Sequence, residues 1–164
     1  MTLNPNPRIY IETSVISYLT ARPNRDLIAQ ARQQASRELW EARERFEFCI
    51  SPEVIREISA GDTLAAQERL VYASQMTLLT GSAPVNQIAD ILISRHALPS
   101  LAYPDALHIA HAALYGMNYI VSWNFRHISG VQQRRHIEAV LRDLGYAEVA
   151  ITTPIDLLEG EISC

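Results

Sequence analysis

Short apolar stretches alternate with longer amphipathic stretches along the whole chain. Runs rich in Ile, Val, Phe and Tyr predict five strands, at 8–12, 46–50, 76–79, 119–122 and 149–152. Apolar residues near helical spacing predict helices at 15–19, 26–45, 52–60, 63–74, 84–96, 104–115, 131–144 and 154–158. Strands that alternate with helices are typical of an α/β layer fold with a mainly parallel sheet.

Capping and breaking residues support several of these boundaries. Ser51 is predicted to cap the helix that follows it, with Pro52 at the first helical position. Thr13 and Ser14 are expected to cap the short helix at 15–19. After Gly160 we expect the chain to be loose.

Length and composition favour one soluble domain. The chain has 164 residues, of which 48% are hydrophobic and 20% charged, so we expect a single domain over 1–164 with a core at about 8–158. Its apolar runs are too short to span a bilayer, and no basic and apolar leader opens the chain. Cys49 and Cys164 cannot build a disulfide framework or a metal cluster, which fits a reducing cytoplasm.

Charge narrows the possible chemistry further. The net charge of −4 argues against a protein that coats nucleic acid non-specifically. All 14 basic residues are arginine, so there can be no lysine Schiff base and no P-loop lysine. Genome bias is the simpler explanation of the missing lysine, and the alternative is phosphate recognition by the planar arginine fork.

Polar side chains follow several of the predicted strands. Glu12 ends the first strand, and Glu57 lies in the helix after the second strand. Asp105 lies in the first turn of a helix, while Asn124 and His127 follow the strand at 119–122. Because the site of a parallel sheet lies at the carboxyl ends of its strands, we expect these side chains to converge there.

Each of these residues also has a structural interpretation. Glu12 could simply cap the helix that follows it, where a negative charge is favourable. Glu57 stands four residues after Glu53, on the same helix face, and we assign Glu53 the structural role. Asp105 could be an ordinary first-turn acid, and Asn124 an ordinary turn residue.

Taken together, three carboxylates and an amide from four segments suggest a site for a hard cation. Oxygen ligands of this kind suit Mg²⁺ or Mn²⁺. Without a metal, the carboxylates would repel one another and their pKa values would rise. A bound metal would also lower the pKa of a water molecule and neutralise charge on a phosphodiester.

Other chemistries fit the sequence less well. Zinc could use His108 with Asp105, but His108 and His111 are about 300° apart around the helix and no HExxH motif is present. We expect His108 to pack beneath the site and His111 to lie on a partly exposed face. Cys49 falls in a buried strand, no nucleophile elbow is present, and a phosphatase would need an Asp-x-Asp motif that residues 11–13 lack.

Four segments together resemble the PIN-domain family, and within it the VapC-like toxins of bacterial toxin–antitoxin pairs. They are IYIETSVISYL at 9–19, SPEVIREI at 51–58, DALHIA at 105–110 and YIVSWNFRHI at 119–128. Their order and spacing match the family over about residues 8–158. The resemblance implies a three-layer α/β/α sandwich with a mainly parallel central sheet.

The resemblance also implies a function. Family members are Mg²⁺- or Mn²⁺-dependent endoribonucleases that usually cut single-stranded RNA, often as homodimers inhibited by a small antitoxin protein. Carried onto this chain, Glu12, Glu57 and Asp105 become the metal ligands, and Asn124 completes the catalytic set. The expected substrate-binding residues are Thr13, Ser14, Arg22 (or its neighbour Arg25), Arg126 and His127.

Two departures from the family pattern keep a second hypothesis open. The first family acid is usually aspartate, and Glu12 moves the carboxylate by roughly 1.5 Å, about one C–C bond. Asn124 is neutral where the family has an acid, so the site carries three formal charges. The alternative is a catalytically weakened PIN-like module that binds RNA or a protein partner without turnover.

Overall fold

A five-stranded parallel sheet forms the centre of the molecule. The computed structural model describes residues 6–124 and 130–162. The strands are β1 (Arg8–Ile11), β2 (Glu47–Ile50), β3 (Thr77–Leu78), β4 (Tyr119–Val121) and β5 (Ala150–Thr152). They lie in the order β3-β2-β1-β4-β5, and every pairing is parallel.

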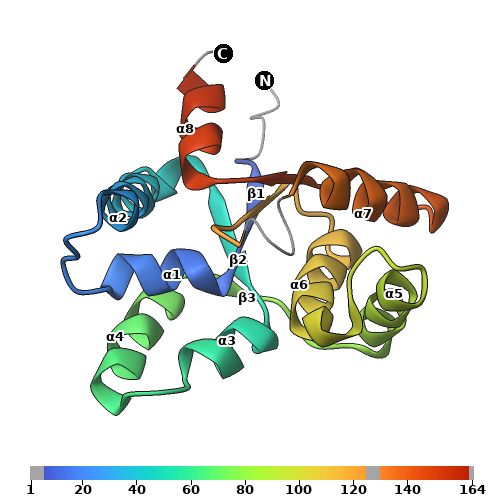
Figure 1. Ribbon diagram of the computed structural model, residues 1–164, viewed down its shortest axis with the longest axis horizontal. Helices are drawn as coiled ribbons and strands as arrows, with labels where there is room; N and C mark the ends of the chain where they lie inside the picture. Colours follow the sequence, from blue (N-terminus) through green and yellow to red (C-terminus); the bar gives the residue numbers. More distant parts are fainter. Residues whose placement is uncertain (1–5, 125–129, 163–164) are drawn as a thin grey trace.

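Helices cover both faces of this sheet. They are α1 (Thr13–Thr20), α2 (Leu27–Glu41), α3 (Pro52–Ile58), α4 (Thr63–Ala73), α5 (Ala83–Ser94), α6 (Tyr103–Leu114), α7 (Val131–Asp143) and α8 (Pro154–Ile162). Figure 1 shows α1, α2 and α4 on one side of the sheet and α5, α6 and α7 on the other. The predicted three-layer α/β/α sandwich is confirmed. No helix in the described ranges is long and apolar enough to cross a membrane.

The apolar runs in the sequence form the buried strands. Ile9, Tyr10 and Ile120 are fully buried, and Ile50 is 1% exposed. A parallel sheet covered on both faces leaves no solvent-facing side for polar residues, so its strands are apolar almost throughout. This is why continuous apolar runs in the sequence located β1, β2 and β4 correctly. The buried Cys49 in β2 also agrees with its predicted position.

The order of the strands creates a switch point beside β1. From β1 the chain adds β2 and β3 on one side, and it later adds β4 and β5 on the other side. The backbone N–H of Glu12 donates to the carbonyl of Val121 at 3.1 Å, so the ends of β1 and β4 lie side by side. In open α/β sheets, ligands bind at such a reversal, outside the carboxyl ends of the strands.

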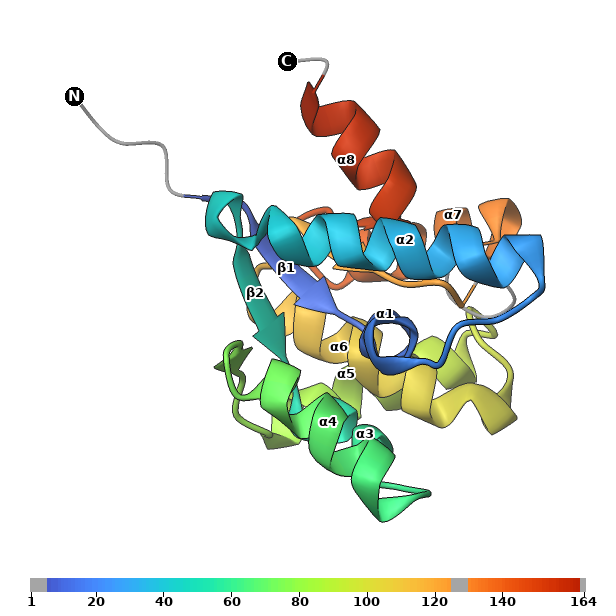
Figure 2. The same cartoon turned by 90° about the vertical axis from the view of Figure 1, so that its left-hand side faces the viewer.

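Some predicted boundaries need correction. Helix α1 begins at Thr13, and its N-cap is Glu12 rather than Thr13 or Ser14, because the Glu12 side chain accepts from the Ser14 N–H. Helix α2 ends at Glu41, and a separate 3₁₀ turn covers the rest of the predicted helix. The chain is also not loose directly after Gly160, because α8 continues to Ile162. Figure 2 shows α8 standing away from the body above α2.

The buried strands give a direct test of the core. Replacing Ile120, which is fully buried in β4, with alanine should lower the free energy of unfolding by about 2–5 kcal/mol, because it removes packed methyl groups and leaves a cavity. Leu101→Ala is the matched control, since Leu101 is 96% exposed and should change stability by less than about 0.5 kcal/mol. Urea denaturation measures both. Equal effects of the two substitutions would contradict this placement of the core.

Candidate active site

Glu12 is held firmly at the end of β1. Its side chain is only 5% exposed, and its Oε2 accepts from the Ser14 backbone N–H at 3.0 Å and from the Ser122 hydroxyl at 2.9 Å. The Ser14 hydroxyl makes a further short bond to the same oxygen. Glu12 therefore caps α1 and also presents a carboxylate at the switch point, so its two possible roles are compatible.

Glu57 reaches the same edge from α3. Its Oε1 accepts from the Thr13 hydroxyl at 2.9 Å and from His108 Nε2 at 2.5 Å. Burial acts to raise the pKa of Glu57, but the hydrogen bond and charge of His108, the Thr13 hydroxyl and the nearby Arg56 together hold it below its ordinary 4.5. Glu57 is therefore a carboxylate at neutral pH. Its neighbour Glu53 pairs with Arg56 instead, which fits a structural role.

Asp105 and Asn124 form a linked pair. Asp105 lies in the first turn of α6, and the Asn124 side-chain amide donates to its Oδ1 at 3.2 Å. The Asn124 backbone N–H donates to the Ser122 hydroxyl at 2.8 Å. Because the same hydroxyl donates to Glu12, Ser122 connects the residues after β4 to the carboxylate after β1.

His108 shows that the three predicted acids lie near one another. This histidine is fully buried, and burial acts to lower its pKa. The hydrogen bond that His108 donates to Glu57 and the charges of Glu12, Glu57 and Asp105 outweigh burial and raise the pKa of His108 above 6.5. Glu57 on α3 contacts the imidazole directly, and Asp105 on α6 and Glu12 after β1 lie close enough to affect its pKa. The expectation that His108 packs beneath the site agrees with this arrangement.

The predicted substrate-binding residues divide into three groups. Thr13 and Ser14 bond to Glu57 and Glu12, so they orient carboxylates. Arg22 is exposed in the connection between α1 and α2. Arg126 and His127 lie outside the described residues.

The sequence of this chain matches the PIN domain over residues 9–129, which is well over half of its length. The chain belongs to the PIN domain family. No curated protein sequence matches it.

Solved structures share the fold at low sequence identity. VapC20 of Mycobacterium tuberculosis, a sarcin-ricin loop cleaving toxin, is 15% identical, with a TM-score of 0.55 over 86% of this chain and 98% of that one. A toxin–antitoxin complex from Klebsiella pneumoniae gives 18% identity and a TM-score of 0.54 over 76% and 93%. VapBC2 from Rickettsia felis, bound to a promoter DNA fragment, is 14% identical in sequence. Its TM-score is 0.57, over 89% of this chain and 98% of that chain. These likenesses show the fold.

Sequence reasoning missed the residues that support the acids of this PIN domain. Tyr10 and Ser122 were not singled out, although one bonds to His108 at 2.6 Å and the other to Glu12. A hydroxyl inside or directly after an otherwise aliphatic buried strand is the signal that could have found them, since a buried hydroxyl needs a partner.

Trp123 anchors the segment that carries Asn124. Its backbone N–H donates to the Ser14 hydroxyl, and its indole N–H donates to Ser36 on α2, both at 2.9 Å. Tyr18 contacts the indole edge-on, with ring centroids 6.1 Å apart. These contacts fix where Asn124 leaves the sheet, so the position of the amide depends on α1 and α2 as well as on β4.

The donor set of the PIN domain is compatible with a small hard cation. Within residues 6–124 and 130–162, no group of three or more His, Cys, Asp or Glu side chains is arranged as a metal cage. Magnesium rarely needs such a cage, because it keeps several waters and uses one or two carboxylates together with substrate phosphates. The chemistry of Glu12, Glu57 and Asp105 therefore fits Mg²⁺ or Mn²⁺ held partly through water.

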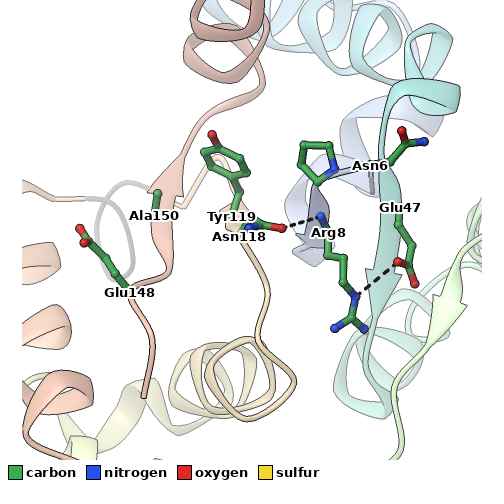
Figure 3. A pocket seen from close by; sticks show the side chains of 8 residues that line it. Asn6, Arg8, Glu47, Asn118, Tyr119, Glu148 and Ala150 are labelled. Atoms are coloured by element: carbon green, nitrogen blue, oxygen red, sulfur yellow. Dashed lines mark hydrogen bonds and ion pairs between the residues drawn. The ribbon is translucent and has the colours of Figure 1, made fainter. Parts of the chain in front are cut away.

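A separate hollow lies at the opposite edge of the sheet. It has a volume of about 580 Å³ and is lined by residues at the amino ends of the strands (Figure 3). There Arg8 bonds to the Tyr115 carbonyl at 2.6 Å and pairs with Glu47 at 3.4 Å, while Asn118 accepts from the Arg8 backbone. These bonds join β1, β2 and the start of β4, so we assign this edge a structural role.

The expectation for His111 was wrong. This side chain is 4% exposed and lines a hollow between α3, α6 and the start of α5. Its Nδ1 lies 2.8 Å from the Leu107 carbonyl, which can only accept, so Nδ1 carries a proton. Nε2 has no hydrogen-bond partner among the described residues. Burial lowers the pKa of His111, and the bond to Leu107 opposes that shift only in part.

His111 should therefore make the protein less stable in acid. Its folded pKa lies below the ordinary 6.5, so as the pH falls below about 6.5 the unfolded chain takes up a proton first and the folded state loses stability. We expect His111→Leu to lose less stability than the wild type between pH 7 and pH 5, as measured by urea denaturation at each pH. The control is His136→Leu, at an exposed histidine on α7. If the stability of the His111→Leu protein falls between pH 7 and pH 5 as steeply as that of the wild type, the prediction is contradicted.

Proposed function

We propose that the protein is a Mg²⁺- or Mn²⁺-dependent endoribonuclease that hydrolyses phosphodiester bonds in single-stranded RNA. The observation that supports this most strongly is a set of hydrogen bonds that links the three acids at the switch point of the sheet. Thr13, which follows Glu12, donates to Glu57. Ser122 donates to Glu12 and accepts from the backbone of Asn124, whose amide donates to Asp105. Membership of the PIN domain family supports the same conclusion.

Each site residue has a role in this proposal. Glu12, Glu57 and Asp105 would hold the metal ion, and Asn124 holds Asp105 in place through its amide. When bound, such an ion supplies a water of lowered pKa and neutralises negative charge on the phosphate. The chain's own contribution is orientation, since hydroxyls and an imidazole fix Glu12 and Glu57 in advance.

RNA contacts would surround this edge of the sheet. Thr13 and Ser14 lie beside the carboxylates, and the exposed Arg22 could reach a phosphate from the connection between α1 and α2. Arg126 and His127 follow Asn124 by two and three positions in the sequence. We assign all five to substrate binding.

We further propose that the protein acts in the cytoplasm as the toxin of a toxin–antitoxin pair. Two of the similar structures are a toxin–antitoxin complex and a VapBC2 assembly. In this proposal the chain is a single PIN-like domain, forms a homodimer and is inhibited by a small antitoxin protein. A neighbouring gene for such a protein would support the pairing.

One observation favours a second candidate function. Glu12 and Asn124 depart from the usual family residues, and no group of acids in the described part of the chain forms a ready metal cage. A PIN-like module with a weakened site would bind RNA or a protein partner without turnover. Tight RNA binding without any cleavage in Mg²⁺ or Mn²⁺ would favour this candidate.

Asp105→Asn tests the nuclease directly. The change keeps the shape of the side chain but removes its charge, so we expect metal-dependent cleavage of end-labelled single-stranded RNAs to fall at least about 100-fold, while thermal unfolding stays close to wild type. Glu148→Gln is the matched control, because Glu148 is an exposed acid at the opposite edge of the sheet. Wild-type cleavage by the Asp105→Asn protein would refute the assignment.

Glu12→Asp tests the departure from the family pattern. The longer glutamate reaches Ser14 and Ser122 at once, and aspartate would pull the carboxylate back by about one bond. We therefore expect the family-like residue to lower cleavage by about 10- to 100-fold and also to weaken the cap of α1. Single-turnover cleavage assays, with the metal ion in excess, measure the change in cleavage rate. Faster cleavage by the Glu12→Asp protein than by the wild type would show that Glu12 lowers the activity relative to the aspartate usual in the family.

A further inference from the structure

A chain of polar side chains runs through the core and ends on Glu57. The Ser51 hydroxyl lies 2.6 Å from the Tyr10 hydroxyl, which lies 2.6 Å from His108 Nδ1. The other ring nitrogen, Nε2, lies 2.5 Å from Glu57 Oε1. Ser51, Tyr10 and His108 are all fully buried. The chain thus connects the end of β2, the middle of β1 and α6 to a carboxylate at the candidate active site.

The bond between His108 and Glu57 has a fixed direction. A carboxylate at neutral pH can only accept, so Nε2 must carry the hydrogen, whether the imidazole is neutral or charged. In both states Nδ1 bonds to the Tyr10 hydroxyl, either accepting from it or donating to it. The hydroxyl of Tyr10 therefore orients the ring, and the ring orients the carboxylate, independently of protonation.

The far end of the chain is fixed to the helix that carries Glu57. The Ser51 hydroxyl accepts from the Val54 N–H at 3.4 Å and is the N-cap of α3. Glu57 lies on this same helix, so its backbone and its carboxylate are held by one continuous network. Without His108, the Thr13 hydroxyl would be the remaining described hydrogen-bond partner of Glu57, and a glutamate with 27% of its side chain exposed would be held less firmly in one rotamer.

A simple packing role does not explain this arrangement. Tyr10 and His108 lie among apolar core residues, where a polar group needs a partner for every hydrogen bond it gives up with water. An aliphatic side chain would fill the same volume without that requirement. The network therefore has a cost for folding, and its result is a carboxylate fixed at the active edge.

We propose that Tyr10 and His108 are positioning residues, which hold the Glu57 carboxylate in the orientation needed for RNA cleavage. This inference rests on the proposed nuclease function. It predicts that loss of the chain lowers the turnover number more than it changes the KM for RNA, since the substrate contacts remain in place.

The test compares three substitutions with one control. Tyr10→Phe removes the hydroxyl and keeps the ring, His108→Leu removes the donor to Glu57, and His108→Gln restores an N–H donor close to the Nε2 position. Tyr115→Phe is the matched control, because its hydroxyl also has two bonding partners, both on Thr80, outside the candidate site. Each protein is assayed for kcat and KM on single-stranded RNA and, by calorimetry, for Mn²⁺ affinity without RNA.

The inference expects a graded result. In Tyr10→Phe the kcat should fall by about 10- to 100-fold with KM within about threefold, and Mn²⁺ should bind more weakly. His108→Leu should lose more, His108→Gln should recover part of that loss, and Tyr115→Phe should match wild type.

The remaining outcomes separate the inference from the proposed function. Wild-type kcat and Mn²⁺ affinity in Tyr10→Phe would overturn the inference while leaving the nuclease intact. If Tyr10→Phe does not fold, equal values for His108→Gln and His108→Leu would overturn it. If the wild type binds Mn²⁺ but cleaves no RNA, the nuclease proposal fails, and the Mn²⁺ affinities of the variants then decide whether Tyr10 and His108 position Glu57 for metal binding alone. If the wild type neither binds Mn²⁺ nor cleaves RNA, both the nuclease proposal and the positioning inference are overturned.

Discussion

The parallel pairing of β1 with β4 is the constraint on which the rest of the site depends. It joins strands that are separated by most of the chain, with Ile11 opposite Val121, and it places Glu12 beside Ser122 at the reversal of the strand order. The hydroxyl of Ser122 then connects Glu12 to the backbone of Asn124. A shift of this register by one residue would turn every side chain of β4 to the other face of the sheet and separate these groups.

The site manages its negative charge mainly with uncharged donors. Among the contacts described, Glu12 is bonded by serines, Asp105 by an asparagine amide, and Glu57 by a threonine and a histidine. Among the ion pairs described, arginine pairs with Glu53, Glu47 and Asp143 rather than with these three acids, although Arg56 lies near enough to Glu57 to help lower its pKa. Neutral donors orient a carboxylate without cancelling its charge, so the edge keeps an electrostatic attraction for a cation.

The same buried network connects polar groups in the core of this PIN domain to its candidate active site. Tyr10 belongs to the central strand of the sheet and is fully buried, yet its hydroxyl bonds to a histidine that contacts Glu57 at the candidate site. Trp123 supports the end of β4 in a similar way. Its indole contacts Tyr18 on α1 and Ser36 on α2, and the next residue is Asn124, whose amide bonds to Asp105. The edge that carries the candidate active site is therefore supported by groups that lie well inside the molecule.

The sequence by itself determined the elements and the candidate acids. Strand runs, the Ser51 cap and the four motifs are local patterns, and local patterns predict local structure. Only the tertiary structure decided how the acids are held, because their supporting groups lie far away in the sequence. Ser122 bonds to Glu12 across 110 positions, and His108 bonds to Glu57 across 51 positions. Tyr10 bonds to His108 across 98 positions. It also decided that His111 is buried, since its exposure depends on the packing of α3 and α5 against α6, which helical periodicity does not contain.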